Sequence, residues 1–137
     1  MMILSHSAEE TRQQAAALAE NVQAGDIILL NGDLGAGKTE WVKGFVAAMG
    51  GTLEVTSPTF NLVHEYNGGK FLVYHWDLYR LDEKTDWSVL DLDAHLKGSG
   101  ITIIEWPERY PHRWPSSSWK IFLEIVDTED RKITCTR

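Results

Sequence analysis

The 137-residue chain has a single cysteine, no apolar run as long as a membrane-spanning helix and no basic stripe. The lone Cys135 excludes an intramolecular disulfide and a multi-cysteine metal site, which fits a reducing cytoplasm. No apolar run approaches the ~20 residues that a membrane span needs. The opening residues, MMILSHSAEE, lack the basic start and the apolar stretch of a secretory signal. We therefore expect a cytoplasmic protein without a membrane contact.

The charge balance also narrows the choice of partners. The formal net charge is −7, and no run of Lys or Arg forms a stripe; the mild gatherings at Arg109–Arg113 and Arg131–Arg137 fit solvated surface. A protein that neutralises the phosphates of a nucleic acid needs several clustered cations, so a large independent nucleic-acid surface is disfavoured. Any contact with RNA should therefore come through a partner. The length and the 43% hydrophobic content fit one soluble domain spanning residues 1–137.

The stretch DIILLNGDLGAGKT carries the clearest chemical signal. Ile27 to Leu30 form an apolar run typical of a buried strand, and Gly32 to Thr39 match G-x-x-x-x-G-K-[ST] before a helical pattern begins. Glycines let successive N–H groups point at one spot, and the helix adds the positive end of its dipole. A tight strand-to-helix turn is the plain alternative, but the strand and helix context favours a polyphosphate site. The predicted nucleotide-binding residues are Asp33, Leu34, Gly35, Ala36, Gly37, Lys38, Thr39 and Glu40.

Two carboxylates stand where parallel strands are predicted to end. Phe60–Tyr66 and Phe71–Trp76 read as a hairpin that delivers Asp77, and the apolar run Ile101–Ile104 is closed by Glu105. In an open sheet, ligands sit at such strand ends. Glu105 is therefore a candidate Mg²⁺ ligand, as is Asp77, for which a helix N-cap or an ion pair with Arg80 is the plain alternative. The next residue, Trp106, either stacks on a base, covers the site or only packs.

The other segments predict the rest of the fold. Ser7 to Glu10 match a capping box ahead of a helix from Ala8 to Asn21. Leu53–Val55 is a candidate short strand, and Asp82–Leu96 is acidic and weakly helical. Trp119–Val126 and Lys132–Thr136 read as a terminal hairpin. The fold class is α/β: a three-layer, P-loop NTPase-like domain whose mixed β-sheet carries antiparallel hairpins.

Four blocks along the chain, NGDLGAGKT, TSPTF, HWDLYR and IIEWPER, together resemble the TsaE family, also called YjeE. These are small bacterial P-loop ATPases of threonylcarbamoyladenosine biosynthesis. The resemblance implies ATP and Mg²⁺ as cofactors and the TsaD and TsaB proteins as partners, which modify adenosine 37 of tRNAs reading ANN codons. It places the Mg²⁺-binding hydroxyl on Thr39, the family's carboxylates on Asp77 and Glu105, and its tryptophan on Trp106. Its switch-like loop falls on residues 56–60, which include Thr59.

One residue departs from the family pattern. Members commonly have a second hydroxyl after the GKT, and here Glu40 takes that place, so its carboxylate must repel the α-phosphate or turn outward.

The leading hypothesis is a Mg²⁺-dependent ATPase in which Lys38 holds phosphate and Thr39 with Glu105 holds the metal. Asp77 then positions or activates water, although Asp77 and Glu105 can exchange these roles. No intrinsic arginine finger is evident, so turnover by the isolated protein should be slow. Alanine at Lys38 or Glu105 should abolish turnover and leave the fold intact.

The alternatives are a small-molecule kinase of the P-loop class and a nucleotide-gated binding module. A kinase usually needs a lid and an acceptor pocket, for which 137 residues leave little room. A GTPase is disfavoured because no N-K-x-D motif occurs.

Overall fold

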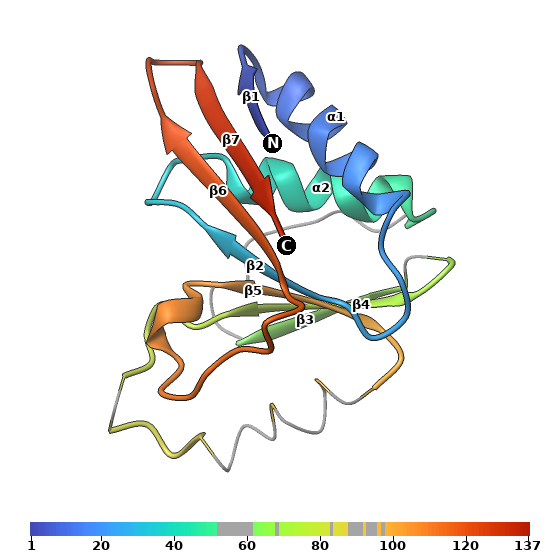
Figure 1. Ribbon diagram of the computed structural model, residues 1–137, viewed down its shortest axis with the longest axis vertical. Coiled ribbons are helices and arrows are strands. Elements are labelled where there is room, and N and C mark those ends of the chain that lie inside the picture. The colour runs from blue at the N-terminus through green and yellow to red at the C-terminus, as the bar shows by residue number, and fades with distance from the viewer. Residues whose placement is uncertain (52–61, 68, 83, 88–91, 93–95, 97) are drawn as a thin grey trace.

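A computed structural model describes residues 1–51, 62–67, 69–82, 84–87, 92, 96 and 98–137. Its elements follow one another along the chain as drawn in Figure 1. They are β1 (Met2–Ser5), α1 (Ala8–Ala19), β2 (Ile27–Asn31), α2 (Lys38–Ala48), β3 (Val63–Asn67), β4 (Leu72–Asp77), β5 (Ile101–Glu105), the 3₁₀ turn η1 (Pro107–Arg109), β6 (Trp119–Ile125) and β7 (Arg131–Thr136).

All seven strands form one mixed sheet in the order β1-β7-β6-β2-β5-β4-β3. The four central strands β6, β2, β5 and β4 are parallel. At one edge β3 pairs antiparallel with β4, and at the other β7 pairs antiparallel with β6 and β1 antiparallel with β7. Every residue of β5 and the first four of β2 are buried, as expected of strands covered on both faces. The prediction of a mixed sheet with antiparallel hairpins is confirmed.

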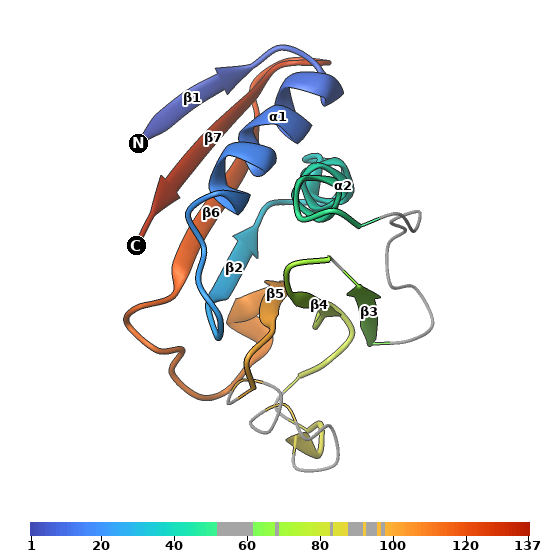
Figure 2. The same ribbon diagram turned by 90° about the vertical axis from the view of Figure 1, so that its right-hand side faces the viewer.

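The two helices pack against each other on the same face of the sheet (Figure 2). Their apolar side chains, with Trp41 stacked on Phe45, build the larger core against the sheet. On the opposite face, Leu78 and Leu92 join Trp76 in a second core, against which Tyr110 and Trp114 also pack. The sheet thus separates the helices from a layer of connecting segments.

The local signals place the helices well. Ser7 caps α1, because its Oγ accepts the N–H of Glu10 at 3.1 Å, and α1 ends at Ala19, two residues before the predicted end. The helix after the phosphate loop is also confirmed. The predicted strand at residues 53–55, the loop at 56–59 and most of the acidic segment 82–96 lie outside the described residues.

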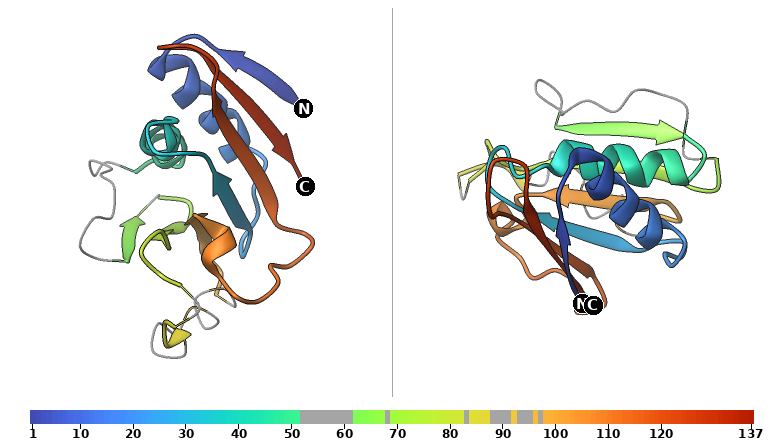
Figure 3. Two further views of the ribbon diagram at one scale, coloured as in Figure 1. Left: turned by 90° about the vertical axis from the view of Figure 1, so that its left-hand side faces the viewer. Right: turned by 90° about the horizontal axis from the view of Figure 1, so that it is seen from above.

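One strand has no counterpart in the sequence prediction. β1 pairs with β7 in antiparallel register, with Ile3 opposite Ile133, and the Met1 amino group donates to the Cys135 carbonyl at 2.9 Å. The two ends of the chain therefore lie side by side (Figure 3). In the described part of the chain, no helix has the length and apolar character needed to cross a membrane.

Candidate functional site

The loop between β2 and α2 has the backbone that the glycine pattern predicts. Gly35 has φ 82° and Gly37 has φ 102°, both in the left-handed region that residues with a Cβ rarely adopt. Gly37 is also the N-cap of α2 and has no side chain to cap it. The first N–H groups of a helix have no partner within the helix, so this end of α2 is suited to an anion.

Lys38 starts α2 and is almost completely buried, with 6% of its surface exposed. Its Nζ lies 3.7 Å from Glu105 Oε1, within ion-pair range but too far for a hydrogen bond. No described group accepts a hydrogen bond from this Nζ. Burial lowers the pKa of Lys38, and the charges of Glu105 and Asp77 oppose that shift. A buried ammonium with unused donors fits a phosphate group.

Asp77 and Glu105 occupy paired positions at the ends of the parallel strands β4 and β5. Glu105 is buried, and Asp77 is half-buried with its Oδ1 accepting the N–H of Tyr79 at 3.0 Å. Burial raises the pKa of Asp77, the Tyr79 N–H lowers it and the charge of Glu105 raises it again. The two carboxylates therefore stand side by side on neighbouring strands. Among the described residues, no ion pair joins Asp77 to Arg80.

Trp106 follows Glu105 with a backbone that is unusual for its residue type. Its φ is 57°, and no other described non-glycine residue has a positive φ. The turn carries the indole over Lys38, whose Nζ lies 4.2 Å from the ring centre, and against Tyr79, whose ring centre is 4.8 Å away. The sequence leaves three roles open for Trp106: stacking on a base, covering the site or only packing. Its position over Lys38 favours a cover over the site.

The oxygen groups at this site suit Mg²⁺ bound together with phosphates. Asp77 and Glu105 bring two carboxylates to the end of the sheet next to Lys38, and Thr39, which carries a hydroxyl, follows Lys38 in α2. In the described part of the chain, no cluster of three or more His, Cys, Asp or Glu residues is placed to hold a metal by itself. Mg²⁺ usually takes one or two protein ligands and completes its shell with water and substrate phosphates. The donor set therefore fits the ion.

The loop residues differ in what their side chains offer. Asp33, Leu34 and Gly35 are exposed at the loop tip, whereas the Ala36 side chain is buried in the core below the helices. Ala36 therefore contributes backbone groups alone to the loop surface. Thr59, the remaining predicted contact, lies outside the described residues.

Arg131, at the start of β7, supports the loop in a way that sequence reasoning missed. Its Nε donates to the Ala36 carbonyl and its Nη2 to the Gly35 carbonyl, each at 3.1 Å. Its Nη1 donates to three carbonyls of the β6–β7 turn, those of Asp127, Thr128 and Asp130. One guanidinium thus ties the turn to the phosphate loop. No local pattern distinguishes this arginine from a solvated one.

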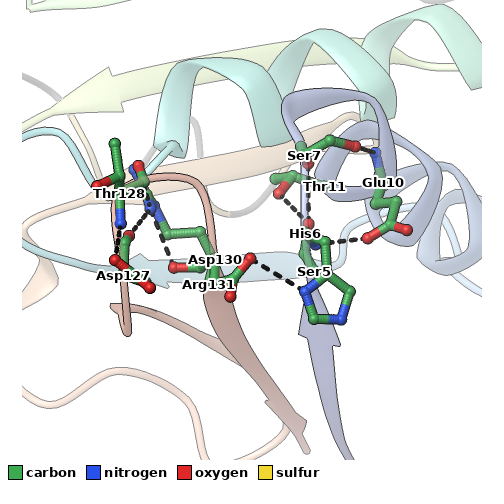
Figure 4. A network of polar contacts seen from close by, with 9 residues as sticks. All are labelled: Ser5, His6, Ser7, Glu10, Thr11, Asp127, Thr128, Asp130 and Arg131. Carbon is green, nitrogen blue, oxygen red and sulfur yellow. Dashed lines mark hydrogen bonds and ion pairs between the residues drawn. The ribbon is translucent and has the colours of Figure 1, made fainter.

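A cavity of about 310 Å³ opens between this turn, the phosphate loop and the start of α1. Gly35 and Gly37 line it on the loop side, Thr11 on the helix side and Thr128 on the turn side. The start of α1 is held to the turn by a contact of 3.0 Å between His6 Nδ1 and Asp130 Oδ1 (Figure 4). The cavity therefore adjoins the glycines of the phosphate loop.

Glu40, the departure from the family pattern, is held by two cations. Its Oε2 accepts from Arg12 Nη1 at 2.6 Å and its Oε1 from Lys43 Nζ at 3.2 Å. Burial raises the pKa of Glu40, but these hydrogen bonds and charges outweigh burial and leave the pKa lowered. The carboxylate is therefore ionised and paired, although Glu40 still lines the cavity.

Comparison with known proteins finds related chains. The family model described as "Threonylcarbamoyl adenosine biosynthesis protein TsaE" matches residues 5–133. The chain is 38% identical to a Bacillus subtilis protein over 93% of this chain and 80% of that one, and 34% identical to a Treponema pallidum protein over 98% of each. Both relatives are named tRNA threonylcarbamoyladenosine biosynthesis protein TsaE.

A solved structure shares the fold as well. The crystal structure of Bacillus subtilis YdiB aligns with a TM-score of 0.80 at 31% identity, covering 98% of this chain and 83% of that one. Both the family match and the relatives extend over nearly the whole chain. The chain belongs to the TsaE family.

Proposed function

We propose that this chain is a Mg²⁺-dependent ATPase that supports formation of threonylcarbamoyladenosine in tRNA. The observation that carries the proposal is the buried Lys38, which faces Glu105 at 3.7 Å and has hydrogen-bond donors to spare. Membership of the TsaE family supports the pathway. The family resemblance further suggests TsaD and TsaB as partners, a cytoplasmic location, and contact with tRNA only through the complex, which suits a net charge of −7.

In the proposed reaction, Lys38 and the N–H groups of the loop bind the β- and γ-phosphates. Thr39 and Glu105 would hold Mg²⁺, which neutralises charge that develops on the phosphate oxygens. Asp77, anchored by the Tyr79 N–H, orients the attacking water and accepts its proton. The water oxygen bonds to the γ-phosphorus, the bond to the β–γ bridging oxygen breaks, and ADP and phosphate leave.

The different surroundings of the two carboxylates support this division of roles. Glu105 is buried between two nitrogen-bearing side chains, Lys38 and His75, whereas Asp77 is half-exposed and has a pKa raised by burial. A carboxylate with a raised pKa is the better proton acceptor. We therefore assign water activation to Asp77 and metal binding to Glu105.

The test is steady-state phosphate release from ATP and Mg²⁺ by this protein alone and then with the cognate TsaD and TsaB proteins. We expect slow release alone and release well above the sum of the separate proteins in the mixture. Lys38→Ala and Glu105→Ala should abolish it, whereas Lys120→Ala, an exposed position on β6, should not. Full activity in either of the first two variants contradicts the assignment.

The same assay separates the alternatives. ATP that binds but is never hydrolysed, even with the partners present, indicates a nucleotide-gated binding module. ATP consumption without release of inorganic phosphate indicates transfer to an acceptor and therefore a kinase.

A further inference from the structure

His75 lies on β4, two residues before Asp77, and its side chain is completely buried with 0% exposed. In the β4–β5 register it stands beside Ile103, while Asp77 stands beside Glu105. His75 therefore shares the helix-covered face of the sheet with Glu105, and its Nε2 contacts Glu105 Oε2. From the sequence, a histidine at this position is expected to be an ordinary strand residue, and its contact with Glu105 becomes visible only in the fold.

The hydrogen-bond pattern of the imidazole indicates a dedicated partner. Among the described residues, Glu105 is the polar group that His75 reaches, and Nδ1 has no hydrogen-bond partner. A buried N–H without an acceptor is costly. The arrangement that avoids this cost has the proton on Nε2, donated to Glu105, and a bare lone pair on Nδ1.

Glu105 is consequently held from two sides. His75 occupies Oε2, and Oε1 faces Lys38 at the start of α2. A carboxylate with one oxygen bound by a rigid, buried donor presents its other oxygen in one direction. Strand β4 is anchored in the core by Val73, so the imidazole has little freedom to move away.

We propose that His75 is a positioning residue that fixes the Glu105 carboxylate so that Oε1 faces the phosphate loop and serves Mg²⁺ there. This inference rests on the proposed function, because it assigns the metal to Glu105. Outer partners of metal ligands typically change metal affinity or activity by about 10- to 100-fold when they are removed. His75 should therefore act on the Mg²⁺ dependence of nucleotide binding and leave metal-free binding unchanged.

The experiment compares two variants of His75 whose side chains end in the same amide group but differ in length. In His75→Gln the amide nitrogen can reach the place of Nε2, whereas in His75→Asn it is one methylene too short. Calorimetric titration with a non-hydrolysable ATP analogue, over a series of Mg²⁺ concentrations and in EDTA, gives the Mg²⁺ midpoint and the metal-free affinity separately. We expect His75→Asn to raise the midpoint about tenfold, with the affinity in EDTA unchanged, and His75→Gln to stay near the wild type.

His75→Met, which fills the space without a donor, gives a second loss variant if the asparagine variant does not fold. A midpoint unchanged in the loss variant, or an equal loss of affinity in EDTA, overturns the inference and leaves the proposed function standing. If nucleotide binding by the wild type does not depend on Mg²⁺, the inference about His75 and the proposed Mg²⁺-dependent function are both contradicted. As a second readout, a loss variant should add nothing to the midpoint of Glu105→Gln, because His75 acts through that residue; additive effects contradict the proposal.

Discussion

Lys38 Nζ lies 3.7 Å from Glu105 Oε1, and both side chains are almost completely buried. Among the described residues, Glu105 is the acidic group within ion-pair range of this lysine. The same carboxylate is the proposed metal ligand. A substitution at Glu105 should therefore change both the stability of the free protein and the rate of ATP hydrolysis. Removing one charge of a buried pair leaves the other uncompensated.

Glu105→Gln keeps the shape of the side chain and removes its charge. We expect hydrolysis to fall by about 100-fold or more, since a metal ligand is lost, and the free energy of unfolding to fall by roughly 3 kcal/mol, the lower end for broken buried pairs. Urea denaturation measures the stability. The double variant Lys38→Met with Glu105→Gln should regain stability because both charges are gone; equal stability of Glu105→Gln and the wild type contradicts the coupling.

Arg131→Ala removes the two hydrogen bonds to the Gly35 and Ala36 carbonyls. At about 1 kcal/mol for each bond, we expect ATP affinity to fall by roughly tenfold to thirtyfold, because the loop is no longer held in its binding conformation. Calorimetry with a non-hydrolysable ATP analogue measures the change. Arg137→Ala is the matched control, since it removes an equal charge near Trp119. Unchanged affinity in Arg131→Ala shows that the loop holds its shape unaided.

Glu40→Thr restores the hydroxyl of the family pattern. The Glu40 carboxylate lines the cavity beside Gly35 and Gly37 and occupies Arg12 and Lys43. Its removal takes a negative charge from the site and frees two cations, so we expect ATP affinity to rise several-fold, more strongly at low salt. Glu40→Gln, which removes the charge without supplying a hydroxyl, should show most of this gain. A weaker affinity in both variants means that the carboxylate assists binding.

The sequence predicts the parts of the site whose placement follows from local rules. The glycine pattern of the loop dictates its backbone, and Asp77 and Glu105 meet because each ends a parallel strand. Strand bounds are correct to within about two residues wherever apolar runs end in polar residues, as at β5.

The features that sequence reasoning missed depend on contacts between distant positions. β1 is short, and its strand character comes from pairing with β7 at the far end of the chain. Arg131 reaches the loop from 95 positions away, and His75 meets Glu105 across 30 positions. One arginine or one histidine carries no local periodicity, so only the sheet order gives it a role.

The His6–Asp130 contact predicts a pH-dependent link between the start of α1 and the β6–β7 turn. The hydrogen bond with Asp130 and then its charge raise the pKa of His6. Because the folded pKa lies above the unfolded one, this stabilisation is complete below about pH 6.5 and is lost as the pH rises through the raised pKa. Asp130→Asn should therefore lower the melting temperature at acid pH and not at alkaline pH.

NMR titration of the His6 ring checks the same link directly. Asp130→Asn should lower the pKa of His6, whereas Asp127→Asn, a charge removed from the same turn without a contact to His6, should change it little. An equal His6 pKa in the wild type and Asp130→Asn excludes the contact in solution.

Gly44→Ala tests how closely the two helices approach beneath the site. A Cβ on Gly44 would lie 2.2 Å from the Arg12 carbonyl oxygen and 2.5 Å from Arg12 Cα. Alanine in a helix gains about 1 kcal/mol over glycine, but overpacking against backbone that cannot rotate away costs about 1–3 kcal/mol or more. We expect the clash to win, lowering the free energy of unfolding by roughly 1–2 kcal/mol in urea denaturation. Because α1 also carries Thr11 to the cavity, ATP affinity should fall as well.

The control is Ala47→Gly, at an exposed position of the same helix, which measures the difference in helix propensity between alanine and glycine alone. A Gly44→Ala protein that is more stable than the wild type would mean that α1 and α2 lie further apart.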